Sequence, residues 1–273
     1  MRELCEKAQA RLQHVDSHLN GESKSIGFML DVCERIVNMQ HNYYSLFLML
    51  QGYPLAKSIS DWFHGGTVES LKNSFYNYAK LRYIYAQPPY NMFGPKVAYS
   101  SDALEGMYFL LSDHEPLIQW YTKLDYNYDK KSTNNIKSVE FYTQQFFIAL
   151  RGEWDVLIER CERIIANPPT NAREKKFMLD HQFYLALAKG DVMGMEAVIK
   201  ELVSPKKIAN RKGLESGFTA DLICTPAIIY SKLAWRNGYE IVVDSPYIPK
   251  EWLPIKPLEK YEDMFEFMKA YTV

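Results

Sequence analysis

The sequence predicts an all-α protein made of stacked αα-hairpins, a tetratricopeptide-like helical array, with a short extended strap framed by prolines near the C-terminus. Three observations support this prediction. Apolar residues recur at steps of three and four along much of the chain, two segments in its second half resemble each other, and Pro246 and Pro249 follow the last clear helical pattern. Stacked hairpins bury their apolar stripes against one another, whereas the prolines bar the strap from continuing a helix.

The composition is that of a globular protein without a dominant charge. Of the 273 residues, 47% are apolar and 14% are aromatic, which is ample for a sizeable core. The 32 basic residues balance 33 acidic ones, so we expect neither a membrane partner nor direct nucleic-acid binding. The N-terminus mixes charges and no segment reaches the ~20 apolar residues of a membrane span, so we expect a cytoplasmic protein.

Cysteine and histidine usage predicts no cofactor and no metal. The four cysteines form no C-x-x-C pair, which favours reduced, packed thiols. They are Cys5, Cys33, Cys161 and Cys224. His14 and His18 have the i, i+4 spacing that could hold a metal, but they lack the glutamate of an H-E-x-x-H motif, which favours a solvated helix face.

Residues 1–90 are predicted to form an N-terminal helical subdomain. The apolar pattern that starts near residue 24 is dense on all sides, which is typical of a buried helix, and Gly52-Tyr53-Pro54 is expected to close it. The expected helices are residues 2–19, about 24–50, a short one through Phe63, and one that Thr67 caps and that reaches Tyr85. A connection rich in proline, residues 87–101, is expected to separate this subdomain from the rest.

Residues 102–273 are predicted to form the hairpin array, with the strap and a terminal helix, and to pack with the first subdomain into one compact unit. The segment Phe141–Pro169 can be laid over the segment that begins at Phe177, with matching residues 37 positions apart, and a weaker third copy begins at Met107. Each copy is two amphipathic helices around a short turn, which is an αα-hairpin. Such hairpins are stable only when stacked.

The helix that closes the array is marked at both ends in the sequence. Thr225 is the expected N-cap, Pro226 occupies the first helical position, and Asn237-Gly238 is the stop. The strap Ser245–Pro249 follows a short β-branched run. We expect this strap to lie extended across helices that are already folded.

No catalytic residues are predicted, and we expect a protein that is not an enzyme. The sequence has no nucleophile elbow, no phosphate-binding glycine loop and no zinc signature. Asp113 and Glu115 are expected to cap a helix that begins at Pro116. A basic loop could contact phosphates, although a solvated loop is favoured. Its basic residues are Lys206, Lys207, Arg211 and Lys212.

Tyrosines and terminal acids are the candidate binding residues. Twenty tyrosines exceed what a helical core readily buries, and tyrosine is favoured at protein interfaces. The segment Leu258–Tyr271 is predicted to be an amphipathic helix with an acidic polar face. The acids of this face are Glu259, Glu262, Asp263 and Glu266.

The strap and the residues before it carry a resemblance to a known family. The sequence from Ser245 to Leu253, SPYIPKEWL, resembles the C-terminal region of bacterial immunity protein family 49, and the stretch Ala186–Asp191 is similar to what precedes it there. The resemblance covers roughly residues 140–255. A weaker resemblance is to the polymorphic-nuclease immunity proteins, whose tryptophan and glutamate-alanine pattern is missing here.

The resemblance implies an all-helical immunity protein of a polymorphic toxin system, which neutralises a cognate secreted antibacterial toxin by stoichiometric binding and protects the producing cell. The implied partner is a toxin domain that acts in the cytosol, such as a nuclease, a deaminase or a nucleotide-directed enzyme. A toxin of this kind has a basic cleft, so an acidic face would complement it. The predicted contacts are Glu259, Glu262, Asp263 and Glu266, with Tyr126 and Tyr128 as anchors.

Other interpretations of the residues stay open. The terminal acids are also explained as a solubilising helix face. The chain could be a helical-repeat adaptor that binds a peptide or a host protein, an all-α enzyme with an unrecognised site, or a nucleic-acid binder through Lys206–Lys212.

Overall fold

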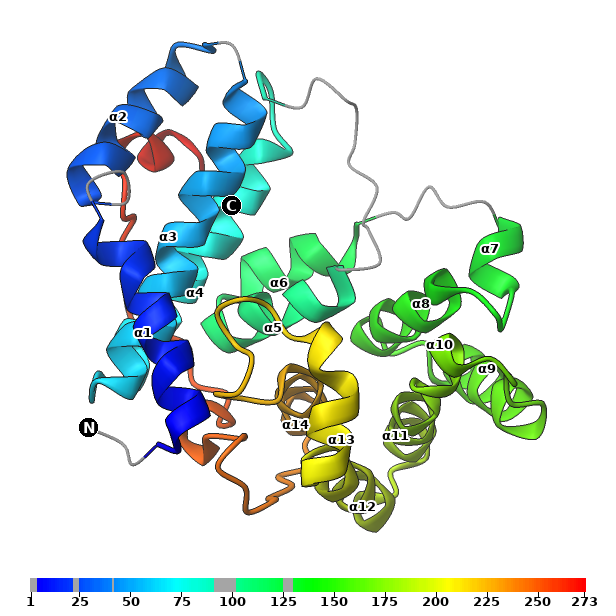
Figure 1. Ribbon diagram of the computed structural model, residues 1–273. Helices are drawn as coiled ribbons and strands as arrows, with labels where there is room; N and C mark the ends of the chain where they lie inside the picture. The colour runs from blue at the N-terminus through cyan, green and yellow to red at the C-terminus, as the bar shows by residue number, and fades with distance from the viewer. Residues whose placement is uncertain (1–3, 22–24, 41, 91–101, 125–129) are drawn as a thin grey trace.

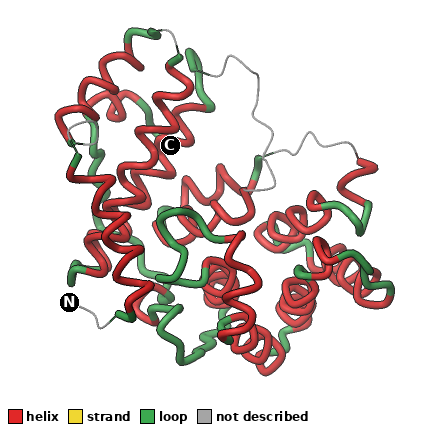
Figure 2. The backbone as a smooth tube through the Cα atoms, viewed as in Figure 1, coloured by secondary structure: helices red, strands yellow, loops and turns green. Residues whose placement is uncertain are grey.

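A computed structural model describes residues 4–21, 25–40, 42–90, 102–124 and 130–273. These residues fold into helices joined by loops, and they contain no β-strand (Figures 1 and 2). The predicted all-α class is therefore confirmed. Within the same ranges, none of the helices combines the length and apolar character that a bilayer crossing requires.

The N-terminal helices pack around a long central helix. They are α1 (Glu6–Asn20), α2 (Ile26–Val37), α3 (Tyr43–Phe63) and α4 (Val68–Tyr85). Helix α3 packs along α4 and also contacts α1 and α2. The predicted cap of α4 is confirmed, because the Thr67 hydroxyl accepts a hydrogen bond from the Ser70 amide at 3.2 Å.

Two predicted helix boundaries in this part are wrong. The single helix expected over residues 24–50 is broken, because Met39 and Asn42 adopt positive φ angles of 52° and 70° between α2 and α3. Helix α3, in turn, does not end at Gly52-Tyr53-Pro54 but continues through Pro54. Proline costs roughly 3 kcal/mol inside a helix. The burial of Leu50 and Leu55 on either side of Pro54 offsets this cost.

The predicted hairpins are present and stack. The copies are α8 (Val139–Leu150) with α9 (Trp154–Ala166), α11 (Met178–Lys189) with α12 (Val192–Leu202), and the weaker copy α5 (Asp102–Ser112) with α6 (Glu115–Thr122). Helix α11 packs on both α9 and α12, so one hairpin lies on the next (Figure 1). The short helices α7 (Lys130–Asn134) and α10 (Ala172–Lys175) lie between successive hairpins, and α13 (Pro205–Arg211) follows the last one.

Helix α14 (Thr225–Arg236) closes the array against α12 and α5. Its stop at Asn237-Gly238 is confirmed, with Gly238 at a φ of 84°. Thr225 does not cap it, because its hydroxyl bonds to the Glu215 carboxylate instead. The predicted extended strap is not found, because the Ile248 amide donates to the Ser245 carbonyl at 3.1 Å and closes a turn there. The Cys224 amide donates to the Tyr247 carbonyl at 3.0 Å, which fixes the strap beside the start of α14.

The predicted terminal helix over residues 258–271 is wrong. Apart from the short 3-10 turns Lys250–Trp252 and Glu266–Ala270, the chain after the strap has no regular secondary structure. It runs along α4 toward α2 (Figure 1). A helix is not needed there, because side chains of α4 supply hydrogen-bond partners for its main chain.

Two buried clusters form the core. The larger joins α1, α3 and α4 to the hairpin array and the strap, with a ring contact of 5.4 Å between Trp62 and Trp252. The smaller packs α2, α3 and the end of α4 around Phe265 and Met268 of the C-terminal segment. All four cysteines are free thiols, and all except Cys5 are buried.

Candidate partner-binding surface

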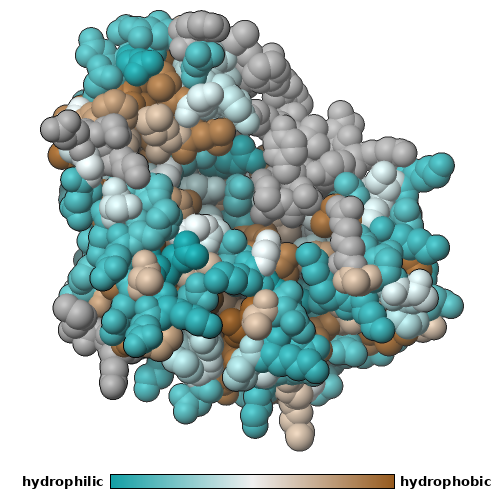
Figure 3. Space-filling model, viewed as in Figure 1, coloured by the Kyte–Doolittle hydropathy of each residue, from teal (hydrophilic) through white to brown (hydrophobic). Residues whose placement is uncertain are grey.

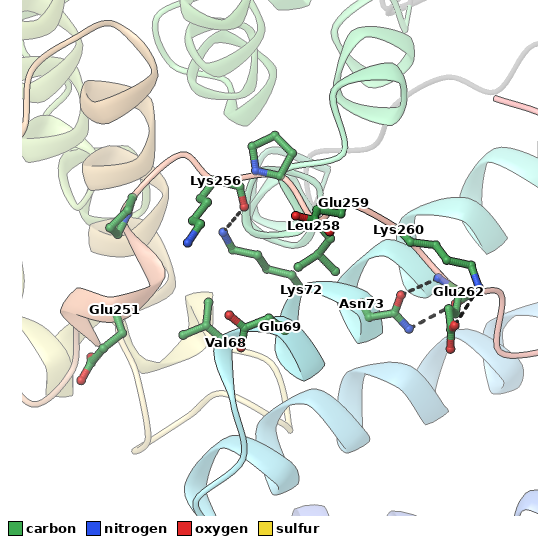
Figure 4. A pocket seen from close by; sticks show the side chains of 12 residues that line it. Val68, Glu69, Lys72, Asn73, Glu251, Lys256, Leu258, Glu259, Lys260 and Glu262 are labelled. Carbon is green, nitrogen blue, oxygen red and sulfur yellow. Dashed lines mark hydrogen bonds and ion pairs between the residues drawn. The ribbon is translucent and has the colours of Figure 1, made fainter.

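A groove lies between the start of α4 and the chain that leaves the strap (Figure 4). Its volume is about 710 Å³, which is in the range of ligand-sized pockets. The residues that line it are Val68, Glu69, Lys72, Asn73, Glu251, Pro254, Lys256, Pro257, Leu258, Glu259, Lys260 and Glu262. Two of the predicted contact residues, Glu259 and Glu262, are therefore brought together on one wall of the groove.

The rim of the groove carries an excess of negative charge. Its exposed carboxylates outnumber its exposed ammonium groups by four to two. The acids are Glu69, Glu251, Glu259 and Glu262, and the bases are Lys256 and Lys260. The pKa of Glu69 lies below its ordinary value, because the carboxylate accepts hydrogen bonds from its own backbone amide and from Thr67 at the start of α4. Glu69 is therefore ionised at neutral pH.

The wall that holds Glu262 is fixed by two asparagines of α4. Asn73 accepts from the Glu262 amide at 2.8 Å and donates to the Glu262 carbonyl at 3.1 Å. Asn77 donates to the same carbonyl at 2.9 Å and accepts from the Met264 amide at 2.6 Å. Figure 4 shows the two contacts between Asn73 and Glu262. The side chain of Glu262 is left exposed to solvent.

A buried lysine–aspartate–lysine cluster lies beneath the groove. Asp113 is 2% exposed, and its carboxylate lies 2.7 Å from the ammonium groups of both Lys72 and Lys232. Lys72 also donates to the Lys256 carbonyl at 2.6 Å, and the Lys256 amide donates to Asp113 at 3.1 Å. Lys232 donates to two carbonyls at the end of the strap. The cluster therefore ties α4, α14 and the turn before α6 to the floor of the groove.

The sequence interpretation missed this cluster. Asp113 does not cap α6, because His114 takes that role and accepts from the Leu117 amide at 3.3 Å through Nδ1. Burial lowers the pKa of Lys232 to about 8, although the nearby Asp113 carboxylate opposes the shift. A lysine within the largely apolar helix α14 was the available signal, but Asp113 lies far away in the sequence.

The other two predicted acids do not line the groove. Asp263 faces α4 with its side chain 11% exposed, where it pairs with Lys80 at 2.8 Å and accepts from the Tyr76 hydroxyl at 2.9 Å. Glu266 is 84% exposed beyond the groove and pairs with Lys269 at 2.6 Å. The acids do not share one face because the segment is not a helix. Tyr126 and Tyr128 lie outside the described residues.

The basic stretch Lys206–Lys212 offers little free charge. Arg211 is buried and forms two 2.7 Å contacts with the Asp180 carboxylate. Lys207 pairs with Glu201 at 3.0 Å, and Lys212 pairs with Asp221 at the same distance. Three of the four basic residues that could contact phosphates thus form ion pairs within the fold.

A second surface is apolar and covers α2 and the first half of α3. The apolar side chains there gather on the face shown in Figure 3. Those that are 38–53% exposed are Ile26, Leu30, Val37, Met39, Tyr44, Leu48 and Met49. The sequence pattern of these helices predicted burial on all sides, so the exposure of this face is a correction. Contiguous exposed apolar side chains are typical of surfaces that contact other proteins.

One family model matches part of the chain, the segment that holds two of the hairpins. Residues 138–252 match the family model of immunity protein 49. The resemblance recognised in the sequence is thereby confirmed for the segment that runs from the Ser138 cap of α8 to the strap. Comparison with curated proteins and with solved structures finds no match. Of the groove residues, only Glu251 lies within the matched segment, so the groove is built mainly by parts of the chain outside it.

Among the described residues, no group of three histidine, cysteine or acidic side chains is placed to hold a metal. His14 and His18 make an edge-to-face ring contact with centroids 4.9 Å apart, and His18 also contacts Phe218. These rings therefore take part in packing between α1 and the loop before α14.

Proposed function

We propose that this protein is an immunity protein that binds a cognate antibacterial toxin and neutralises it without catalysis. The match of residues 138–252 to immunity protein 49 is the observation that supports the proposal. An inhibitor that acts by binding the toxin needs a stable surface that complements it and needs no catalytic residues. A rigid array of hairpins meets this requirement.

The acidic groove is the proposed contact surface. A toxin that acts on nucleic acid or nucleotides carries basic residues in its cleft, and carboxylates opposite them speed association and exclude wrong partners. Glu259 and Glu262 are exposed, and the main chain at Glu262 is held by hydrogen bonds to Asn73 and Asn77, so little conformational freedom of this main chain is lost on binding. The groove, at about 710 Å³, has room for side chains of a partner.

The segment that matches the family and the rest of the chain contribute differently to the candidate binding surface. The part that matches the family supplies the hairpin scaffold, and the N-terminal helices and the C-terminal segment supply most of the groove. We infer that these outer parts determine which toxin is bound. Cytosolic action of the toxin, and its chemistry, stay predictions.

Co-expression tests the proposal most simply. The product of the gene immediately upstream is expressed alone and together with this protein carrying an affinity tag. We expect growth arrest from the upstream product alone, and growth together with a stable co-purified complex when both are present. A harmless or unbound upstream product would contradict the proposal and favour the helical-repeat adaptor.

A further inference from the structure

One face of α4 holds an extended segment of the same chain. Its side chains recur every fourth residue, in the two rows Asn73 with Asn77 and Tyr76 with Lys80, and all four contact residues 262–264. Asn77, Tyr76 and Lys80 are buried, although polar side chains of a helix ordinarily face water. The face is therefore specialised for holding another stretch of chain.

The asparagines recognise main chain and not side chains. Each carboxamide offers one acceptor and one donor group, and Asn73 uses both on the amide and carbonyl of the same residue, Glu262. Asn77 accepts a hydrogen bond from the amide of Met264, two residues after Glu262. This spacing fits an extended chain, in which alternate residues present their main-chain groups to the same side.

Three side chains of the held segment add specificity. Asp263 enters the site formed by Lys80 and Tyr76, while Phe265 and Met268 are buried among apolar residues of α2, α3 and α4. Further along, the Tyr83 hydroxyl donates to the Thr272 carbonyl at 3.0 Å. The recognised pattern is thus an acid in an extended stretch, an aromatic two residues later and a methionine three residues after that, in the 3-10 turn Glu266–Ala270.

The held segment is separated from the rest of the fold by exposed chain. Residues 254–257, 259 and 260 are exposed, and the buried cluster at Asp113 fastens the chain within this stretch, at the main chain of Lys256. A break after Glu259 would leave that fastening intact. We propose that the face of α4 is a receptor for an extended peptide, and that residues 260–273 are a ligand that binds it in cis and exchanges with the same segment of a second copy. This inference does not depend on the toxin.

The test uses the full chain, with a recognition sequence for a specific protease inserted between Glu259 and Lys260. After folding and cleavage, we expect the segment 260–273 to remain bound during gel filtration. A fluorescent synthetic peptide of residues 260–273 should then replace it, with a rise in anisotropy that unlabelled peptide reverses. Uncleaved protein should bind the same peptide at least tenfold more weakly, because its own segment competes at high effective concentration.

Variants of the peptide test recognition without altering the receptor. Asp263→Asn or Phe265→Ala in the peptide should weaken exchange about tenfold or more, and a scrambled peptide should not bind. In the receptor, Asn77→Ala should weaken binding, while Asn167→Ala on the exposed end of α9 should not. Equal binding of native and scrambled peptides would overturn the proposal. So would a segment that leaves only when the protein unfolds, since that segment would be core and not ligand.

Discussion

Glu259 and Glu262 can be reversed in charge without touching the core, because both side chains are exposed on the groove wall. We expect the double variant Glu259→Lys, Glu262→Lys to bind the toxin about tenfold more weakly, mainly through slower association, with a larger effect at low salt. Glu266→Lys is the matched control, because Glu266 is an exposed acid of the same segment outside the groove. Surface plasmon resonance at two salt concentrations measures both rates. Equal association rates for the two variants would remove the groove from the binding surface.

We expect His181 to lower the free energy of unfolding at acidic pH. It is buried beside the rings of Phe141 and Tyr142, and burial lowers its pKa from 6.5 to about 4. Between these pH values His181 is protonated in the unfolded chain but stays neutral in the folded protein. The free energy of unfolding therefore falls as the pH drops from 6.5 toward 4. The loss from this group is about 3 kcal/mol.

A variant isolates the contribution of this histidine. His181→Leu should make the free energy of unfolding less dependent on pH between 6.5 and 4, whatever its effect at neutral pH. Asn167→Ala, at an exposed position without a titratable side chain, should keep the dependence of the parent protein. Urea unfolding at a series of pH values measures the slopes, and identical slopes for all three proteins would contradict the assignment.

At the scale of elements, the two hairpin turns differ in one respect that can be tested. Gly152 and Gly190 have nearly the same positive φ, 67° and 68°, which costs roughly 1–2 kcal/mol for a residue with a Cβ atom. A Cβ at Gly190 would also lie 2.9 Å from the Tyr239 hydroxyl, whereas at Gly152 its nearest neighbour is 3.7 Å away. Gly190→Ala should therefore lower the unfolding free energy more than Gly152→Ala. Equal losses would mean that Tyr239 moves aside freely.

Elements with local signals could be predicted from the sequence. The cap at Thr67, the hairpin helices and the stop at Gly238 depend on residues within a few positions, and each was found where expected. The course of α3 through Pro54 could not be predicted, because burial by distant helices decides it. The same holds for the C-terminal segment, whose main chain is paired with side chains nearly 190 residues earlier.

Only part of the candidate site could be predicted, because the rest also depends on contacts between residues far apart in the sequence. Glu259 and Glu262 were identified by charge alone, and they do lie together. The orientation of Asp263 toward Lys80, and the cluster of Asp113 with two lysines, depend on contacts across the fold that no local pattern indicates.

At the scale of the whole molecule, the larger core cluster spans the N-terminal helices and the hairpin array. Phe75 of α4 contacts both Tyr108 of α5 and Trp252 of the 3-10 turn after the strap. We therefore expect residues 1–90 and 102–273 to unfold together. Hydrogen exchange at increasing denaturant should show the core amides of α3 and α11 losing protection at the same concentration. Earlier loss in α3 alone would instead indicate two independent subdomains.

The proposed mode of inhibition is stoichiometric binding of the toxin, and titration of toxin activity tests it most directly. Increasing amounts of the purified protein are added to a fixed concentration of the purified upstream product, and the residual toxin activity is measured. We expect a linear fall that reaches zero at a fixed molar ratio, and a more rounded curve for the Glu259→Lys, Glu262→Lys variant when the toxin concentration is near its dissociation constant. Protection by amounts far below the toxin concentration, or no effect at any ratio, would contradict it.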